Sequence, residues 1–508
     1  MSSRNIRNYN HNNNININNN NETFLKPRRR PNSVTRLSEI QDLERKARRQ
    51  QADQPVHEPK DSLLSSSSGY TNYRGLLNLC IILLVLSNAR VALENIIKYG
   101  ILVDPFQWIK VFIGKPNAWP SCQLILSANI FILISYIIEH IFAANKWREA
   151  SGGTVVVINI LSILALPPIV INSVPCNPIG ASIACGLYSI VSLKLVSYHM
   201  VNYWCRKRSA KKLSNAGSHS RRRSFTSKDL HKTVQNGSAT SDPKHDLVEY
   251  PNNLNLTDLY YFMCAPTLCY ELNFPRSERI RKRFLIKRIL EILFLLQLDL
   301  GLIQQWMVPT ISNSLKPLQE MHFSKMLERL LKLAVPNHII WLIFFYWFFH
   351  SCLNTIAEIL RFSDREFYKD WWNSESVNYF WKNWNMPVHK WCVRHLYKPL
   401  INRGVNKFHA SVIVFLLSAF FHEYLVSVPL SMFRLWAFFG MLSQIPFSMF
   451  VSKYLNNQTA NIAVWISLII GQPLCILMYY HDYYVIHHVN QVTNYDYSRP
   501  QHSFVHQI

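Results

Sequence analysis

The sequence predicts an all-α, polytopic membrane protein with about nine transmembrane helices. Of its 508 residues, 49% are hydrophobic and only 14 are glycine. Nine runs stay apolar over the ~20 residues that a helix needs to cross a hydrocarbon core of ~30 Å. Isolated strands could not satisfy their backbone groups in lipid, so each run is expected to be helical. The nine ranges are 75–98, 121–143, 154–175, 178–204, 285–309, 334–360, 411–430, 432–451 and 460–485.

The polar ends of the chain are set apart from this apolar core, which spans residues 71–490. Residues 1–70 are rich in asparagine, arginine and serine and contain little apolar surface. Such a composition cannot repay the entropy cost of ordering, so we expect a disordered segment. It contains no early apolar stretch typical of a secretory signal peptide. Residues 491–508 form a short polar tail.

Charge predicts how the chain is oriented in the membrane. The formal net charge is +24, and the basic segments are 1–70, 205–284 and 361–410. Four spans separate the first two and two spans separate the last two, so all three fall on one side. The positive-inside tendency makes that side the cytosol and puts the tail in the lumen. Basic cytosolic loops account for the charge better than a nucleic-acid partner does.

The ten cysteines are scattered along the chain and form no Cys-x-x-Cys pair or His/Cys cluster. Neither a disulfide framework nor a metal site is predicted.

His422 and Glu423 lie inside the apolar run 411–430. His422 is about 16 Å along the helix from Ser411, which puts it near the middle of a membrane. Ionisable groups at that depth are rare and usually face an interior cavity, and imidazole suits proton transfer at neutral pH. A histidine held by an interhelical hydrogen bond is the structural alternative. Gln444 and Gln472, in the next two apolar runs, favour a polar-lined cavity.

The cytosolic segment 361–410 combines many aromatic residues with polar ones, a composition typical of a membrane interface. Pro387 is expected to open an amphipathic helix that lies in this interface. Apolar and aromatic residues recur there at helical spacing, and cations occupy another stripe. The first stripe consists of Val388, Trp391, Cys392, His395 and Leu396, and the second of Lys390, Arg394 and Lys398.

Two motifs resemble the membrane-bound O-acyltransferase superfamily. The first has the sequence Phe-Tyr-Lys-Asp-Trp-Trp-Asn, and the second is the His-Glu pair in an apolar helix. The first is similar in sterol and diacylglycerol acyltransferases, and longer stretches favour the diacylglycerol enzymes. Those stretches are 73–78, 87–90, 265–275, 301–309 and 418–429. The characteristic residues of the first motif are Phe367, Tyr368, Asp370, Trp371, Trp372 and Asn373.

The resemblance implies site residues position by position. It implies His422 as the catalytic histidine, Asn385 as a second residue needed for activity, and Glu423, Gln444 and Gln472 around the reaction chamber. It also implies an acyl-CoA contact region made of Trp381, Lys382, Asn383, Trp384, Asn385, Met386, Pro387, Val388, His389, Tyr397, Ser411 and Tyr484. Ser411 replaces an arginine of related animal enzymes, so Lys407 would have to supply the cation.

The implied activity is transfer of an acyl group from acyl-CoA to diacylglycerol in the endoplasmic reticulum membrane. Acyl-CoA would be a co-substrate, with no permanently bound cofactor and no metal. The family also implies a homodimer or homotetramer, with the part of the N-terminal segment near 34–68 at the contact. A sterol or long-chain alcohol as acceptor is the alternative within the same chemistry. A non-catalytic lipid transporter is the alternative from another class, but its inverted repeats and paired broken helices are not visible.

Overall fold

The computed structural model describes residues 74–106, 119–222, 248–314 and 323–486. Within these ranges every regular element is a helix, and one isolated bridge joins Arg276 to Phe362. The predicted all-α class is therefore confirmed. The segment 1–70 and the tail 491–508 lie outside the described residues.

The chain divides into two units, residues 1–86 and 87–508. The described part of the first unit is the beginning of helix α2, which runs from Arg74 to Tyr99. All the other described elements belong to the second unit, which contains the candidate site.

Six stretches of helix within the described ranges are long and apolar enough to cross a membrane. They are Trp119–Ala143, Glu149–Ser173, Pro178–Lys211, Phe323–Ile359, Lys407–Ser427 and Thr459–Tyr484. The other three predicted spans are helical too, but the helices α17 (Trp436–Leu442) and α18 (Gln444–Tyr454) have only seven and eleven residues. Six spans are thus supported by length and composition, and the predicted number of nine stays a prediction.

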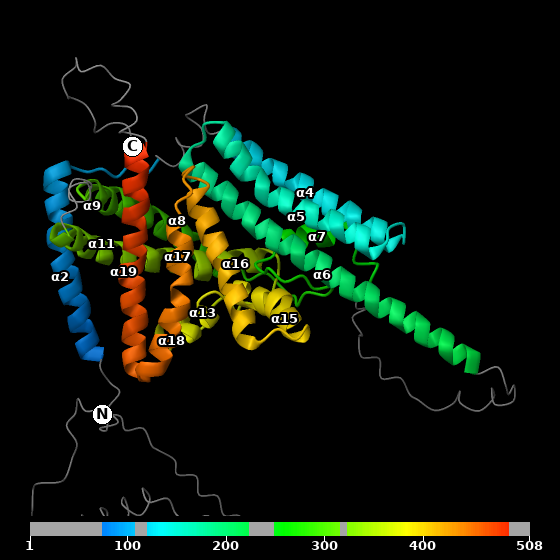
Figure 1. The fold of residues 1–508 in the computed structure, drawn as a ribbon. Helices are drawn as coiled ribbons and strands as arrows, with labels where there is room; N and C mark the ends of the chain where they lie inside the picture. Colours follow the sequence, from blue (N-terminus) through cyan, green and yellow to red (C-terminus); the bar gives the residue numbers. More distant parts are fainter. Residues whose placement is uncertain (1–73, 107–118, 223–247, 315–322, 487–508) are drawn as a thin grey trace, which may run out of the picture. The chain divides into compact units, whose positions relative to one another are not determined.

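Helices α4 (Trp119–Ala143), α5 (Glu149–Ser173) and α6 (Pro178–Arg222) pack side by side (Figure 1). Buried polar contacts join them, including Asn159 Nδ2 to Ser135 Oγ at 2.8 Å and His199 Nδ1 to Glu139 Oε1 at 2.6 Å. Such contacts hold helices together in lipid, where no hydrophobic effect drives association. The predicted loop 205–284 therefore begins as helix, since α6 continues to Arg222.

The short helix α7 (Leu256–Cys264) is fastened to α6 by a buried lysine. The ammonium of Lys194 donates to the carbonyls of Phe262, Met263 and Ala265 at 2.7–2.9 Å. A cation is favourable at a helix C-terminus, where carbonyl groups lack partners. These bonds fix the start of the segment 265–275 against α6.

Two long stretches of helix contain π-helical turns. The first is α8 (Lys282–Leu302), η2 (Ile303–Met307) and α9 (Val308–Ser312). The second is α11 (Phe323–Phe345), η3 (Tyr346–Cys352) and α12 (Leu353–Ile359). π-Helical turns are rare and often occur at functional sites. The turn η3 bears His350, which contacts the aromatic motif described below.

The last part of the chain is formed by α16 (Lys407–Ser427), α17, α18 and α19 (Asn457–Tyr484). Figure 1 shows α17 and α18 as successive helices, and both contact α19. Before them lie the single turn η4 (Trp371–Asn373) and helix α13 (Val377–Asn383). A continuous stretch follows, made of α14 (Met386–Trp391), the π-helix η5 (Cys392–Tyr397) and α15 (Lys398–Asn402).

Candidate functional site

The aromatic motif 367–373 is packed into the helices around it. Trp371 is buried, with ring centroids of Phe345, Trp341 and Trp465 lying 5.0, 5.3 and 5.8 Å from its own. These three rings come from α11 and α19, which are distant in sequence. The motif thus joins two membrane helices to the segment that follows it.

Polar groups of the motif bond to protein side chains. The Tyr368 hydroxyl lies 2.8 Å from His350 Nδ1, and Asp370 accepts from the Tyr379 hydroxyl at 2.8 Å. The carbonyl of Trp372 accepts from Asn461 Nδ2 at 3.2 Å. These contacts indicate a supporting role for the motif. His350 lies in the predicted apolar run 334–360, but it was not predicted as a site residue because it has no cluster of polar neighbours in the sequence. Its partner is 18 residues away and on another element.

Two backbone hydrogen bonds join the motif to the predicted acyl-CoA contact region. Lys369 N donates to Asn383 O at 2.8 Å, and Met386 N donates to Phe367 O at 3.0 Å. Asn385 lies between these bonds as the N-cap of α14, where its side chain accepts from Val388 N at 3.2 Å. A capping Asn satisfies a backbone donor that the helix leaves open. The residues from Trp381 to His389 are therefore brought together with the motif.

The predicted amphipathic helix begins where Pro387 indicated, in the first turn of α14. Trp391 and His395 of the predicted apolar stripe are buried, and Val388 is exposed. His389 is half-buried, and its burial, with Lys382 and Lys369 nearby, lowers the pKa of its imidazole. His389 is therefore neutral at pH 7.

Lys390, from the predicted cationic stripe of the same helix, forms an ion pair in which its Nζ lies 3.0 Å from Asp364 Oδ2.

His422 is half-buried on α16, about one and a half turns before the end of that helix. Its Nδ1 lies 2.7 Å from the backbone carbonyl of Ser418. A carbonyl can only accept, so Nδ1 bears the proton, and the lone pair of the neutral ring is on Nε2. This is the tautomer in which Nε2 can act as a base.

The carboxylate of Glu423 accepts four hydrogen bonds around the turn between α16 and α17. Oε1 accepts from Ser427 Oγ and from Leu435 N at 2.8 Å. Oε2 accepts from Phe438 N at 3.0 Å and from the Tyr479 hydroxyl at 2.7 Å. The adjacent residues His422 and Glu423 therefore differ in role, because the carboxylate is committed to the protein's own donors.

The two glutamines predicted at the chamber lie on different helices. Gln444 is the first residue of α18, at the break after α17, and it is half-buried. Gln472 is half-buried on α19, and its Oε1 accepts from Asn337 Nδ2 of α11 at 3.3 Å. Each therefore adds a polar group to an otherwise apolar helix.

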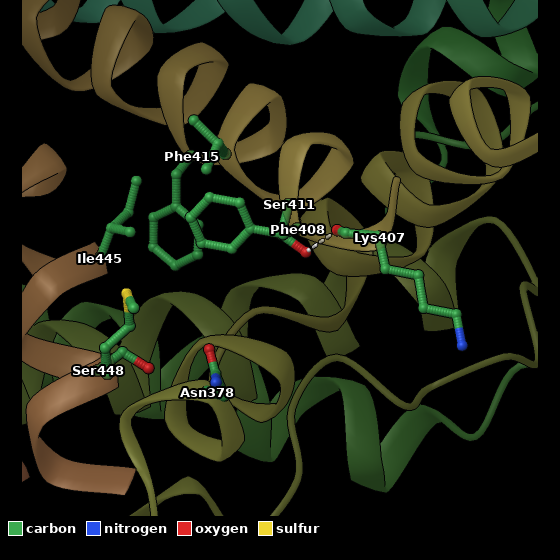
Figure 2. A pocket seen from close by; sticks show the side chains of 9 residues that line it. Asn378, Lys407, Phe408, Ser411, Phe415, Ile445 and Ser448 are labelled. Atoms are coloured by element: carbon green, nitrogen blue, oxygen red, sulfur yellow. Dashed lines mark hydrogen bonds between the residues drawn. The ribbon is translucent and has the colours of Figure 1, made fainter. Parts of the chain in front are cut away.

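A cavity of about 250 Å³ lies between α13, α16 and α18. Figure 2 shows the rings of Phe408 and Phe415 at its centre, with the Lys407 side chain extending away from them. Ser411 donates to the carbonyl of Lys407 at 3.0 Å, so its hydroxyl is engaged within the helix. The lining residues are Asn378, Lys407, Phe408, Ser411, Val412, Phe415, Ile445, Ser448 and Met449. Asn378 and Ser448 were not among the predicted site residues, because Asn378 is one of several polar residues in its segment and Ser448 is a small hydroxyl in an apolar run.

The remaining two predicted contact residues lie at helix ends. Tyr397 is half-buried at the end of η5, within the same stretch of helix as Met386. Tyr484 is the last residue of α19, whereas Asn461 and Trp465, which contact the motif, lie near the start of that helix. The 19 to 23 residues that separate Tyr484 from them correspond to about 29–35 Å of helix. The structure therefore does not bring Tyr484 together with the segment from Trp381 to His389.

The described site thus combines a base-competent histidine in an apolar helix with an aromatic interfacial segment. A model of the MBOAT, membrane-bound O-acyltransferase family matches residues 179–481. The chain belongs to this family. It is 55% identical over 433 residues, or 85% of either chain, to diacylglycerol O-acyltransferase 1 of Homo sapiens. The Bos taurus protein of the same name is 54% identical over 437 residues, which are 85% of this chain and 86% of that one.

A more distant relative extends this similarity beyond animals. Diacylglycerol O-acyltransferase 1 of Dictyostelium discoideum is 37% identical over 426 residues, which are 84% of this chain and 64% of that one.

Proposed function

We propose that this chain transfers the acyl group of acyl-CoA to the free hydroxyl of diacylglycerol, which yields triacylglycerol. The observation that carries the proposal is the 55% identity, over 85% of both chains, to a diacylglycerol O-acyltransferase. His422 supports it independently, because a base-competent imidazole inside an apolar helix suits a reaction between two lipid substrates.

In the proposed mechanism, Nε2 of His422 takes the proton of the diacylglycerol hydroxyl as its oxygen attacks the thioester carbonyl. The tetrahedral intermediate collapses with cleavage of the C–S bond. The coenzyme A thiolate leaves and recovers the proton from the imidazolium. General-base help of this kind is typically worth 10²–10⁴-fold. Positioning of the two lipids and polar groups near the developing oxyanion supply the rest, and Asn385 and Gln444 are our candidates for those groups.

Acyl-CoA is the co-substrate in this proposal, and it enters along the interfacial segment 381–411. Its phosphates would meet cations there, among them Lys407, whose side chain extends away from the aromatic rings of the cavity (Figure 2). Backbone bonds from the motif hold the segment at both Asn383 and Met386, which supports a preformed site.

We further propose that the protein resides in the endoplasmic reticulum membrane with its N-terminus cytosolic and its C-terminus lumenal. Cations support this orientation, because the segment 361–410 bears nine lysines and arginines. They are Arg361, Arg365, Lys369, Lys382, Lys390, Arg394, Lys398, Arg403 and Lys407.

We propose a homo-oligomer, a dimer or tetramer, whose contact includes the N-terminal segment near 34–68. Removal of residues 1–70 is then expected to reduce the mass of the detergent-solubilised particle to that of a monomer, because the contact is lost. Light scattering on purified protein measures that mass. A particle of unchanged mass would remove the N-terminal segment from the contact.

The acceptor is tested by giving labelled acyl-CoA to microsomes that contain the chain, with diacylglycerol or a sterol in parallel. Label is expected in triacylglycerol, at least tenfold above microsomes that lack the chain. Label in the sterol ester instead would favour the alternative acceptor. Label in neither product, with purified protein of correct size and fold, would favour a lipid transporter over an enzyme.

A further inference from the structure

The interfacial stretch of helix from Met386 to Asn402 is pinned to α6 at two points. Trp391 Nε1 donates to the carbonyl of Leu193 at 2.8 Å, and His395 Nε2 lies 2.8 Å from Ser197 Oγ. Trp391 and His395 are four residues apart on the interfacial helix, and Leu193 and Ser197 are four residues apart on α6. The two bonds therefore form a ladder, one turn apart, between two elements almost 200 residues apart in sequence.

His395 is enclosed by this ladder. It is only 5% exposed, and its ring lies parallel to that of Trp204 with centroids 5.5 Å apart. The ring of Trp391 covers another side at 5.7 Å. A group so enclosed between protein rings cannot touch a bound coenzyme, so any effect on binding must pass through the helix that bears it.

The Ser197 hydroxyl takes part in two hydrogen bonds of this contact. Tyr270 N donates to Ser197 Oγ at 2.8 Å, which uses the hydroxyl as an acceptor. Its other bond, to His395 Nε2, can form with either tautomer of the neutral ring, because the hydroxyl has a second lone pair as well as a proton. Burial and the neighbouring Arg394 lower the pKa of His395 to about 4, so the ring is neutral at pH 7.

The same contact fastens the segment 265–275 to the interfacial helix. The carbonyl of Tyr270 accepts from Arg394 at 2.9 Å, while its N–H is bonded to Ser197. The hydroxyl of Tyr270 donates to Asp258 at 2.5 Å and accepts from Asn253 at 3.0 Å. Ser197 is fully buried at the meeting point of α6, this segment and the interfacial helix.

We propose that His395 and Ser197 are positioning residues for acyl-CoA binding: their hydrogen bond fixes the interfacial helix, and with it the segment from Trp381 to His389. This inference rests on the proposed function, which assigns that segment to acyl-CoA. The helix is continuous from Met386, so an anchor at Trp391 and His395 sets the direction of its first turn. Asn385 caps that turn and therefore moves with it.

Two substitutions of His395 separate the hydrogen bond from the ring. His395→Gln removes the ring but places an amide oxygen near the position of Nε2, whereas the shorter side chain in His395→Asn does not reach Ser197. We expect His395→Asn to raise the KM for acyl-CoA about fivefold, the equivalent of ~1 kcal/mol for one buried hydrogen bond. The KM for diacylglycerol should not change. His395→Gln should stay within about twofold of the wild type.

Ser197→Ala tests the other partner, and Ser135→Ala is its matched control. Both serines are fully buried and hydrogen-bonded, but Ser135 bonds to Asn159 between α4 and α5. Ser197→Ala should raise the KM for acyl-CoA like His395→Asn, and the double variant should show no further rise. Ser135→Ala should lower the midpoint of thermal unfolding and leave that KM unchanged.

The measurements are steady-state kinetics with each substrate varied and direct binding of a non-hydrolysable acyl-CoA thioether to the purified protein. The proposal is overturned if His395→Asn and Ser197→Ala lower only the yield or the unfolding midpoint, with thioether affinity unchanged. It is also overturned if His395→Gln weakens binding as much as His395→Asn. A wild type that binds the thioether but forms no triacylglycerol would refute the diacylglycerol acceptor and leave the binding test of His395 intact.

Discussion

Replacement of His422 by alanine is expected to lower kcat for acyl transfer at least about hundredfold, because the acceptor hydroxyl loses its general base. The structure favours this nitrogen for a specific reason: Nδ1 is engaged by the carbonyl of Ser418, which leaves the lone pair on Nε2. The KM for acyl-CoA should change little, since the imidazole acts on the acceptor. Steady-state kinetics on purified protein check both parameters.

A matched control for this variant exists on the same helix. His409 is exposed near the start of α16, away from the turn that bears His422. His409→Ala should keep kcat within about twofold. Equal unfolding midpoints for the two variants would exclude misfolding as the cause of inactivity. If His422→Ala retained most of its activity at wild-type stability, the histidine would be a structural group and another base would be required.

The helices could be predicted from the sequence because a long apolar run in lipid can satisfy its backbone hydrogen bonds only as a helix. The start of α14 at Pro387 was readable for a similarly local reason, since proline lacks the N–H that the first helical turn does not use. The π-helical turns and the break at Gln444 could not be predicted. They depend on which backbone hydrogen bonds survive when helices pack, and composition does not encode that choice.

Some residues of the candidate site could likewise be predicted from the sequence, and others could not. His422 could be found because an ionisable side chain is conspicuous in an apolar run. The apolar stripe of the interfacial helix was predicted from helical spacing, and Trp391 and His395 of that stripe are buried, whereas Val388 is exposed. Their partners could not be found, because Leu193 and Ser197 are 198 residues away. Tyr484 differs from these residues. The resemblance assigns it to the acyl-CoA contact region, but it is the last residue of a 28-residue helix whose other end lies near the motif.

Glu423 was expected at the reaction chamber, and its contacts predict a large effect on stability instead. Glu423→Ala should lower the free energy of unfolding by at least about 3 kcal/mol, because four donors lose their acceptor, among them the buried hydroxyls of Ser427 and Tyr479. Two of these donors are the backbone N–H groups of Leu435 and Phe438, which no side-chain movement can redirect. The midpoint of thermal unfolding in detergent measures the loss.

Glu423→Gln separates the stabilising role from a chemical one. The amide keeps one acceptor oxygen, but its NH₂ group cannot accept from Phe438 N or the Tyr479 hydroxyl. We expect a smaller loss of stability than for alanine, with kcat of the folded fraction within a few-fold of the wild type.

Tyr479→Phe removes one donor to the carboxylate and should lower the free energy of unfolding still less, by about 1–2 kcal/mol. A Glu423→Gln protein of wild-type stability and strongly reduced kcat would instead give the carboxylate a part in the reaction. If the carboxylate organises the α16–α17 turn, the loss of stability should be largest for Glu423→Ala, smaller for Glu423→Gln and smallest for Tyr479→Phe. Activity should be preserved in Glu423→Gln and Tyr479→Phe.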